Sequence, residues 1–166
     1  MYTNFSELPS NSRVWIYQAA RDLTEEEIKK VEDWLTYFIS TWQSHGSNLC
    51  GSFQILYRRF IILGVDTTNN LPSGCSIDSS VAALKEIENG LGVGLFERTQ
   101  IPFLEEGGKV TTVNLSEIKQ KVESGVITPQ SLTFNNLVDT KEKLKSEWLT
   151  CAGDTWLSRY FKKSVA

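Results

Sequence analysis

The residues whose types could do chemistry gather in one stretch, "LPSGCSIDSSV" at residues 71–81. Cys75 is the candidate nucleophile, because a thiol near a helix N-terminus can have its pKa lowered and become reactive. A catalytic thiol also needs a general base, and His45 is the single histidine of the chain. Asp78 or Asp66 could orient its imidazole. Cys75, His45 and Asp78 are therefore the catalytic candidates of a thiol-dependent enzyme.

The same stretch could instead bind a ligand. A helix N-terminus offers free N–H groups and a positive dipole end, and a glycine lets an anion approach the backbone closely. Small and polar residues are dense here, at the exit of an apolar strand. The expected ligand-binding residues are Ser73, Gly74, Cys75, Ser76, Asp78 and Ser79.

Helix capping is the alternative explanation of these residues, since Ser and Asp are ordinary at a helix start. In this interpretation Ser76, Asp78 or Ser79 caps the helix that follows, and no function is implied. A phosphate-binding P-loop is excluded, because the stretch lacks its second glycine and its lysine. "GLGVG" at 90–94 also lacks the spacing and the strand-to-helix context of a dinucleotide-binding motif.

The composition is that of a globular chain with one core. Of 166 residues, 40% are hydrophobic and 22% are charged, and the formal net charge is −3. This length fits a single domain. The acidic balance argues against nucleic acid as a partner, because binding to the phosphate backbone needs a basic surface. The pair Arg58 and Arg59 is expected to be solvated surface.

The cysteines indicate a reducing compartment. Cys50, Cys75 and Cys151 lie far apart and form no C-x-x-C pair, which fits neither a disulfide framework nor a zinc site. The N-terminal residues lack the features of a secretory signal, and the longest apolar run is far shorter than the ~20 residues of a spanning helix. We therefore expect a cytoplasmic protein with no membrane insertion and no metal or cofactor.

The hydrophobic pattern of the first half predicts strands and two long helices. β-Branched and aromatic residues predict a strand over 13–18, and Thr24 with Glu27 forms a capping box that starts a helix over 25–42. A hairpin follows, with strands at 52–57 and 60–66, and the second strand is apolar enough to be central. A further helix is predicted over "SVAALKEIENG" at 80–90, with Gly90 as its C-terminal stop.

The second half is predicted from shorter signals. "IPFL" and "KVTTV" form a second hairpin in which Pro102 should lie near an edge, since proline cannot donate to a ladder. Asn114 starts a short helix. "FNNL" at 134–137 could place an amide pair in a cleft or could simply form a turn, where Asn is common. The pattern predicts one α+β domain over residues 1–166, with a mixed or mainly antiparallel sheet of about five to six strands and helices packed on it.

Five segments carry a resemblance to a known family: "SRVWIYQ", "FIILGVD", "SGCSIDSSV", "FNNLV" and "WLSRYF" at 156–161. With them, the chain resembles a family of small, functionally uncharacterised bacterial proteins that are often labelled ABC transporter ATPases. The segments span nearly the whole chain, so the resemblance is to a full-length family. It implies that label without implying ATP hydrolysis, because the P-loop lysine and the signature motif of an ABC ATPase are absent.

We therefore expect a non-enzymatic cytoplasmic domain that binds a small anionic ligand or another protein through residues 71–81. The alternatives are the thiol-dependent enzyme that uses Cys75 with His45, and an atypical nucleotide-binding protein. The sequence does not indicate an oligomeric state.

Overall fold

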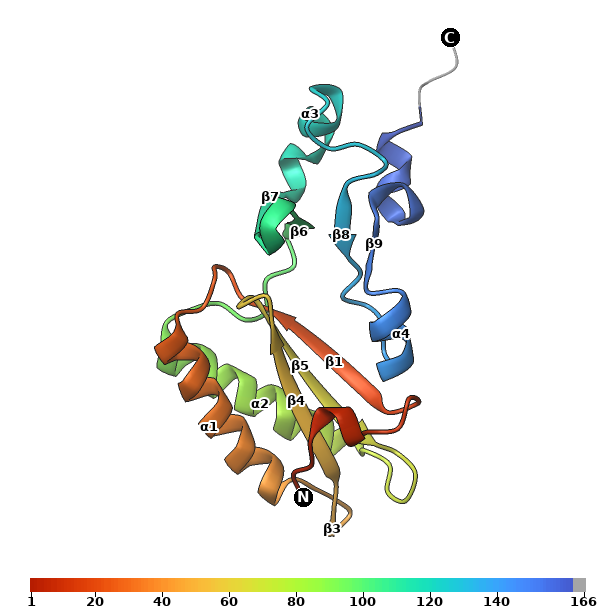
Figure 1. The fold of residues 1–166 in the computed structure, drawn as a ribbon. Helices are drawn as coiled ribbons and strands as arrows, with labels where there is room; N and C mark the ends of the chain where they lie inside the picture. Colours follow the sequence, from red (N-terminus) through yellow and green to blue (C-terminus); the bar gives the residue numbers. More distant parts are fainter. Residues whose placement is uncertain (163–166) are drawn as a thin grey trace.

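A computed structural model describes residues 1–162 (Figure 1). The strands are β1 (Arg13–Gln18), β2 (Gln43–Ser44), β3 (Ser47–Asn48), β4 (Cys50–Leu56), β5 (Phe60–Asp66), β6 (Gln100–Leu104), β7 (Val110–Asn114), β8 (Leu132–Phe134) and β9 (Leu149–Cys151). The α-helices are α1 (Glu25–Thr41), α2 (Gly74–Leu91), α3 (Ile118–Glu123) and α4 (Lys141–Ser146). The 3-10 turns are η1 (Phe5–Glu7), η2 (Glu106–Gly108), η3 (Leu115–Glu117), η4 (Ala152–Asp154) and η5 (Trp156–Tyr160).

The first sheet has the strand order β1-β5-β4 and is antiparallel throughout. β5 is central, and every residue from Phe60 to Val65 is buried, as expected for a strand covered on both faces. One face of the sheet is covered by α1 and α2, whose apolar residues form a core with Leu63 and Val65. Figure 1 shows both helices on that side. The predicted hairpin and its central strand are confirmed.

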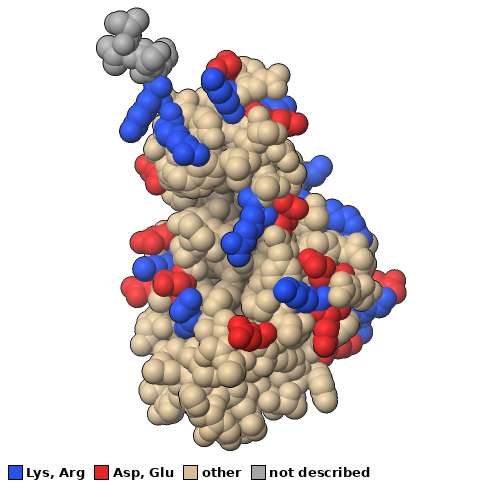
Figure 2. All heavy atoms as spheres, turned by 180° about the vertical axis from the view of Figure 1, so that it is seen from behind, with Lys and Arg blue, Asp and Glu red and all other residues tan. Residues whose placement is uncertain are grey.

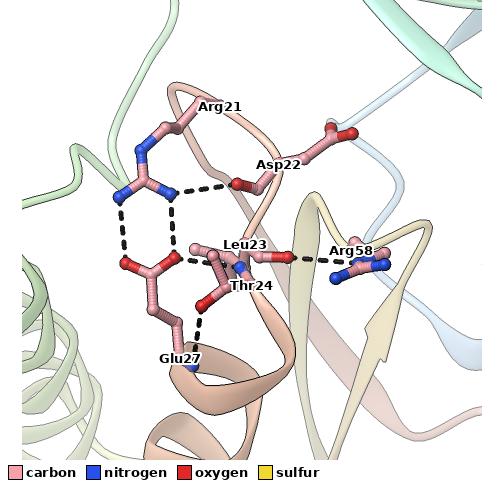
Figure 3. Close-up of polar contacts among 6 residues, drawn as sticks. All are labelled: Arg21, Asp22, Leu23, Thr24, Glu27 and Arg58. Atoms are coloured by element: carbon pink, nitrogen blue, oxygen red, sulfur yellow. Dashed lines mark hydrogen bonds and ion pairs between the residues drawn. The ribbon is translucent and has the colours of Figure 1, made fainter.

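Helix α1 starts as the sequence predicts, with a complete capping box. The Glu27 N–H donates to Thr24 Oγ1 (3.1 Å), and the Thr24 N–H donates to Glu27 Oε1 (2.9 Å). Arg21 adds a bidentate pair to the same carboxylate, at 2.8 and 2.9 Å (Figure 3). These bonds hold the pKa of Glu27 at about 2, below its ordinary value of 4.5, chiefly because Arg21 stabilises the charged form.

The tip of the β4–β5 hairpin anchors the loop between β1 and α1. Tyr57 and Arg58 both have left-handed φ values, 56° and 57°, which form the turn without the usual glycine. Arg58 Nε donates to the Leu23 carbonyl (3.1 Å; Figure 3). Arg59 is only 6% exposed and donates to the carbonyls of Ala19 and Ala20, at 2.8 and 3.1 Å.

The prediction that Arg58 and Arg59 are solvated surface is therefore wrong for Arg59. Its guanidinium satisfies loop carbonyls and pairs with Asp22 (3.2 Å), so its charge is compensated on folding. Local sequence gives no sign of this, because the partners lie about forty residues earlier in the chain.

The second sheet has the order β7-β6-β8-β9 and is also antiparallel. β6 and β7 form the predicted second hairpin. Pro102 was expected near a sheet edge, yet β6 is an inner strand. The β6–β8 ladder begins only at Phe103, so the missing N–H of Pro102 removes no bond there, and its carbonyl accepts from Thr133 Oγ1 (2.7 Å).

A shared core joins the two sheets. Val14, Phe60 and Ile62 of the first sheet pack against Phe134 of β8 and against Trp148. The rings of Phe60 and Phe134 lie 4.7 Å apart at their centroids. A separate core lies within the second half, where Leu157 of the closing segment packs against Ile118 of α3 and Phe103. These contacts dock the closing segment on the body.

The α+β class with antiparallel pairing is confirmed, but the strands form three sheets and not one. β2 and β3 make a separate two-stranded ribbon, and β8 and β9 have three residues each. Strands this short carry too few residues for an alternating pattern to identify them. Helix α2 ends at Leu91 and not at Gly90, and the residue that caps it is Gly92, with a left-handed φ of 68°. A Cβ at Gly90 would lie 3.0 Å from the Trp34 ring, so this glycine allows α1 to approach α2 closely.

The Glu27 contacts predict how stability changes with acid. Because the pKa of Glu27 is lower in the folded chain than in the unfolded chain, its contribution is present above pH 4.5 and is lost as the pH falls toward about 2. Glu27→Gln keeps the capping box but removes the charge that pairs with Arg21, so it should lower the free energy of unfolding near neutral pH by about 0.5 kcal/mol. Urea denaturation across this range should show the difference from wild type shrinking with acid. Glu26→Gln is the control, because the Glu26 side chain is 82% exposed; an equal effect there would contradict the assignment.

Candidate functional site

Residues 71–81 form the connection to α2 and its first turns. Ser73 is the N-cap, and its hydroxyl accepts from the Ser76 N–H (3.1 Å). The Ser76 hydroxyl donates to the Ser73 carbonyl (2.8 Å), and the Ser79 hydroxyl donates to the Cys75 carbonyl (2.9 Å). The prediction that Ser76, Asp78 or Ser79 is the cap is wrong, because the helix begins earlier, at Gly74. Most of the polar density thus serves the helix start, and ligand binding by these residues stays a prediction.

The candidate catalytic residues lie on two separate elements. Cys75 and Asp78 are exposed on the first turns of α2. His45 lies in the tight turn between β2 and β3, with a left-handed φ of 52°. It lines a shallow hollow with residues 67–72, and Cys75 is not among the lining residues. Within residues 1–162, no hydrogen bond joins any two of these three side chains.

A different part of the molecule is hollowed. An open cleft of about 1240 Å³ follows β1, between the first sheet and the segments that surround β8 and β9. Figure 2 shows the surface hollowed between the upper and lower parts of the molecule. All of β1 lines the cleft, together with residues 95–98 and 133–139. The cleft therefore lies where the two halves of the chain meet.

A polar network ties β1 to the far wall of the cleft. Gln18 is buried, and its Nε2 donates to the Gln100 carbonyl (2.8 Å). Asn136 Nδ2 donates to Gln18 Oε1 (3.0 Å), and Trp148 Nε1 donates to Asn136 Oδ1 (2.9 Å). Each amide thus uses both its donor and its acceptor, which fixes its orientation. The sequence prediction that "FNNL" places an amide pair in a cleft is confirmed, since Asn135 and Asn136 both line it.

The lining is rich in aromatic and aliphatic side chains. Trp15, Ile16 and Tyr17 are half-buried along β1, and Tyr17 meets Phe96 edge-on, with centroids 5.4 Å apart. Burial raises the pKa of Tyr17, an effect that the nearby Ser80 hydroxyl partly offsets. The phenol is therefore neutral near pH 7 and offers an apolar ring with a hydrogen-bonding tip.

Two apolar side chains among the lining residues are strongly exposed. Leu137 is 89% exposed, and Trp156 is 47% exposed. A single exposed apolar residue is ordinary on a protein surface, but exposed residues that line an aromatic cleft indicate a contact surface. Sequence reasoning missed both residues. No local pattern in the sequence marks either residue, because the exposure of each depends on segments that are distant in the chain.

Charged side chains of both signs line the cleft: Arg13, Lys85, Arg98, Glu97, Asp139, Glu147 and Asp154. Glu97 accepts bonds from the Thr99 N–H and hydroxyl, at 3.0 and 2.7 Å, which lower its pKa. The Arg13 guanidinium lies over the Trp15 ring, 5.1 Å from its centroid. Acids outnumber bases among these residues, so the cleft does not carry the positive field that an anion requires. In the described part of the chain, no group of three or more His, Cys, Asp or Glu side chains is placed to hold a metal ion.

Comparisons with family models, with curated proteins and with solved structures found no match to this chain. The resemblance to the family labelled ABC transporter ATPases therefore stays a prediction. Among residues 1–162, no helix combines the length and the apolar character needed to cross a membrane.

The amide network predicts a measurable coupling between β1 and the far wall. Gln18→Ala and Asn136→Ala should each lower the free energy of unfolding, because each leaves at least one partly or fully buried polar partner without its hydrogen bond. A double-mutant cycle by urea denaturation should give a coupling energy of about 1 kcal/mol. The matched control is Asn135→Ala with Gln18→Ala, since within residues 1–162 the Asn135 Oδ1 accepts only from the nearby Leu137 N–H. A coupling no larger than in the control would show that the network does not join the walls.

Proposed function

We propose that this protein is a non-enzymatic binding domain that interacts with another protein through the cleft along β1. The observation that carries the proposal is the exposure of Leu137 and Trp156 beside a half-buried aromatic lining. Aromatic and aliphatic pockets anchor protein partners by desolvating a few apolar side chains, while satisfied polar groups fix their position. Gln18 and Asn136 supply such fixed groups here.

The composition of the cleft favours a protein partner over a small anion or a nucleotide. Four acids and three bases line it, and no glycine is among its lining residues to let a phosphate approach the backbone. An anion site at Ser73, Gly74, Cys75, Ser76, Asp78 and Ser79 would be separate from this cleft, since none of these residues lines it. The thiol-dependent enzyme would also work outside the cleft, and no contact between Cys75 and His45 supports it.

The cysteines support the proposal that the protein works in the cytoplasm. Cys50, Cys75 and Cys151 are all free, and Cys75 is exposed. Exposed free thiols are typical of reducing compartments.

Selection of displayed random heptapeptides on the intact protein tests the cleft. We expect enriched peptides to carry apolar residues, and Leu137→Asp to weaken their binding at least about tenfold, because a carboxylate would have to be desolvated. Trp156→Ala should weaken it in the same direction by removing an apolar anchor. Isothermal titration of the strongest peptides would measure both effects.

The control variant is Tyr37→Asp, which changes another strongly exposed apolar side chain, 72% exposed, on α1 and outside the cleft. Peptide binding should be unchanged in this variant. Binding that survives both cleft substitutions, or a selection that enriches no peptide, would overturn the proposal.

A further inference from the structure

β1 has a hydrogen-bonding edge that β5 does not use. In an antiparallel pair, the backbone groups of successive residues point to opposite sides of the strand. The Val14 N–H points away from β5, because it donates to the Asp139 carbonyl (2.9 Å). Ile16 has the same parity, so its N–H and C=O point to that side, along the cleft that Ile16 lines. Within residues 1–162, no hydrogen bond from outside the β1–β5 ladder reaches Ile16.

The chain itself pairs with this edge on both sides of Ile16. Arg13 forms an antiparallel bridge with Thr140, supported by a bond from the Lys141 N–H to the Ser12 carbonyl (2.9 Å). Gln18 forms a parallel bridge with Phe96 at the other end of the strand. The edge is therefore covered at its ends and open in the middle.

Resting on the proposed function of the cleft, we infer that the partner contributes a short extended segment that pairs with the backbone of Ile16 and adds a strand to β1. An unpaired backbone donor and acceptor on one edge residue match the backbone of an extended chain, which offers both groups at the strand spacing. An apolar small molecule would fill the cleft without satisfying either group.

The two faces of β1 offer apolar contacts for alternating side chains of that segment. Trp15 and Tyr17 lie on the face toward α2, with Phe96 beside Tyr17. Ile16 lies on the opposite face, in the cluster that contains Phe134. Successive side chains of an added strand point to opposite faces of the sheet, so consecutive apolar residues would reach both clusters.

Four of the seven charged lining residues are separated by sign between two sides of the cleft, while Glu97 lies beside Arg98 and has its carboxylate bonded to Thr99. Lys85 on α2 and Arg98 in the following connection lie on one side, while Glu147 and Asp154 flank β9 on the other. None of these four side chains forms an ion pair within 4.0 Å in the described chain. A complementary segment carries an acidic residue toward α2 and a basic residue toward β9.

The test uses the heptapeptides selected on the intact protein. Synthetic copies methylated at one backbone nitrogen at a time should show one position where methylation weakens binding at least about tenfold, because it removes the donor to the Ile16 carbonyl. Addition of the unmodified peptide should slow hydrogen exchange of the Ile16 amide. Ile16→Pro lacks the outward N–H and costs no bond to β5, so it should weaken binding similarly in a variant shown to remain folded, whereas Ile16→Val should not.

Outcomes separate this inference from the proposed function. Peptides that lose affinity for Leu137→Asp but are insensitive to backbone methylation, with unchanged exchange at Ile16, would leave the cleft as a binding site and overturn strand addition. Peptides whose affinity is unchanged by Leu137→Asp would overturn both the proposed binding site and strand addition. Charge reversal of Lys85 and Arg98 to Glu should weaken the binding of acidic peptides and not of neutral ones. Equal effects on both kinds of peptide would contradict the placement of an acidic residue toward α2.

Discussion

The central strand β5 requires cover on both faces of the first sheet, and the other elements follow from that constraint. Six successive buried residues, from Phe60 to Val65, cannot be shielded by the helices on one face alone. α1 and α2 bury Ile61, Leu63 and Val65, while the aromatic cluster of Phe134 and Trp148 buries Phe60 and Ile62. The second half of the chain is therefore a structural necessity for the first, because an exposed Phe60–Ile62 face would leave a large apolar patch in water.

This arrangement also explains where the cleft lies. The second sheet reaches the opposite face of β5 by way of segments that run along β1, and these segments pair with β1 only at Arg13 and at Gln18. Residues 135–138, which lead to the bridge at Arg13, turn away from β1. The Val138 N–H donates to the Asn135 carbonyl (3.3 Å) and not to β1. Asn136 and Gln18 then hold the far wall at a fixed distance.

Sequence reasoning succeeded where structure is set by local chemistry. The bounds of β1, the capping box of α1 and the β4–β5 hairpin follow from alternation, capping and apolar runs within about twenty residues. The candidate site was harder to predict because its residues come from β1, the α2–β6 connection and the segments around β8 and β9. The sequence drew attention to Ser73 through Ser79, whose polar groups mostly serve the start of α2. Burial of Arg59 and exposure of Leu137 depend on distant segments, so no local pattern could distinguish them.

The partial covering of β1 limits what can pair with it. A long open edge would join edges of other chains without selection, and native proteins commonly shorten or cover such edges. Here the molecule covers both ends with its own backbone and leaves a single residue of suitable parity, Ile16. A second sheet edge cannot lie flat against this gap, because residues 139–141 and Phe96 occupy the positions that its neighbouring residues would take. A short segment can enter, and its selectivity then comes from the side chains around the gap more than from the backbone.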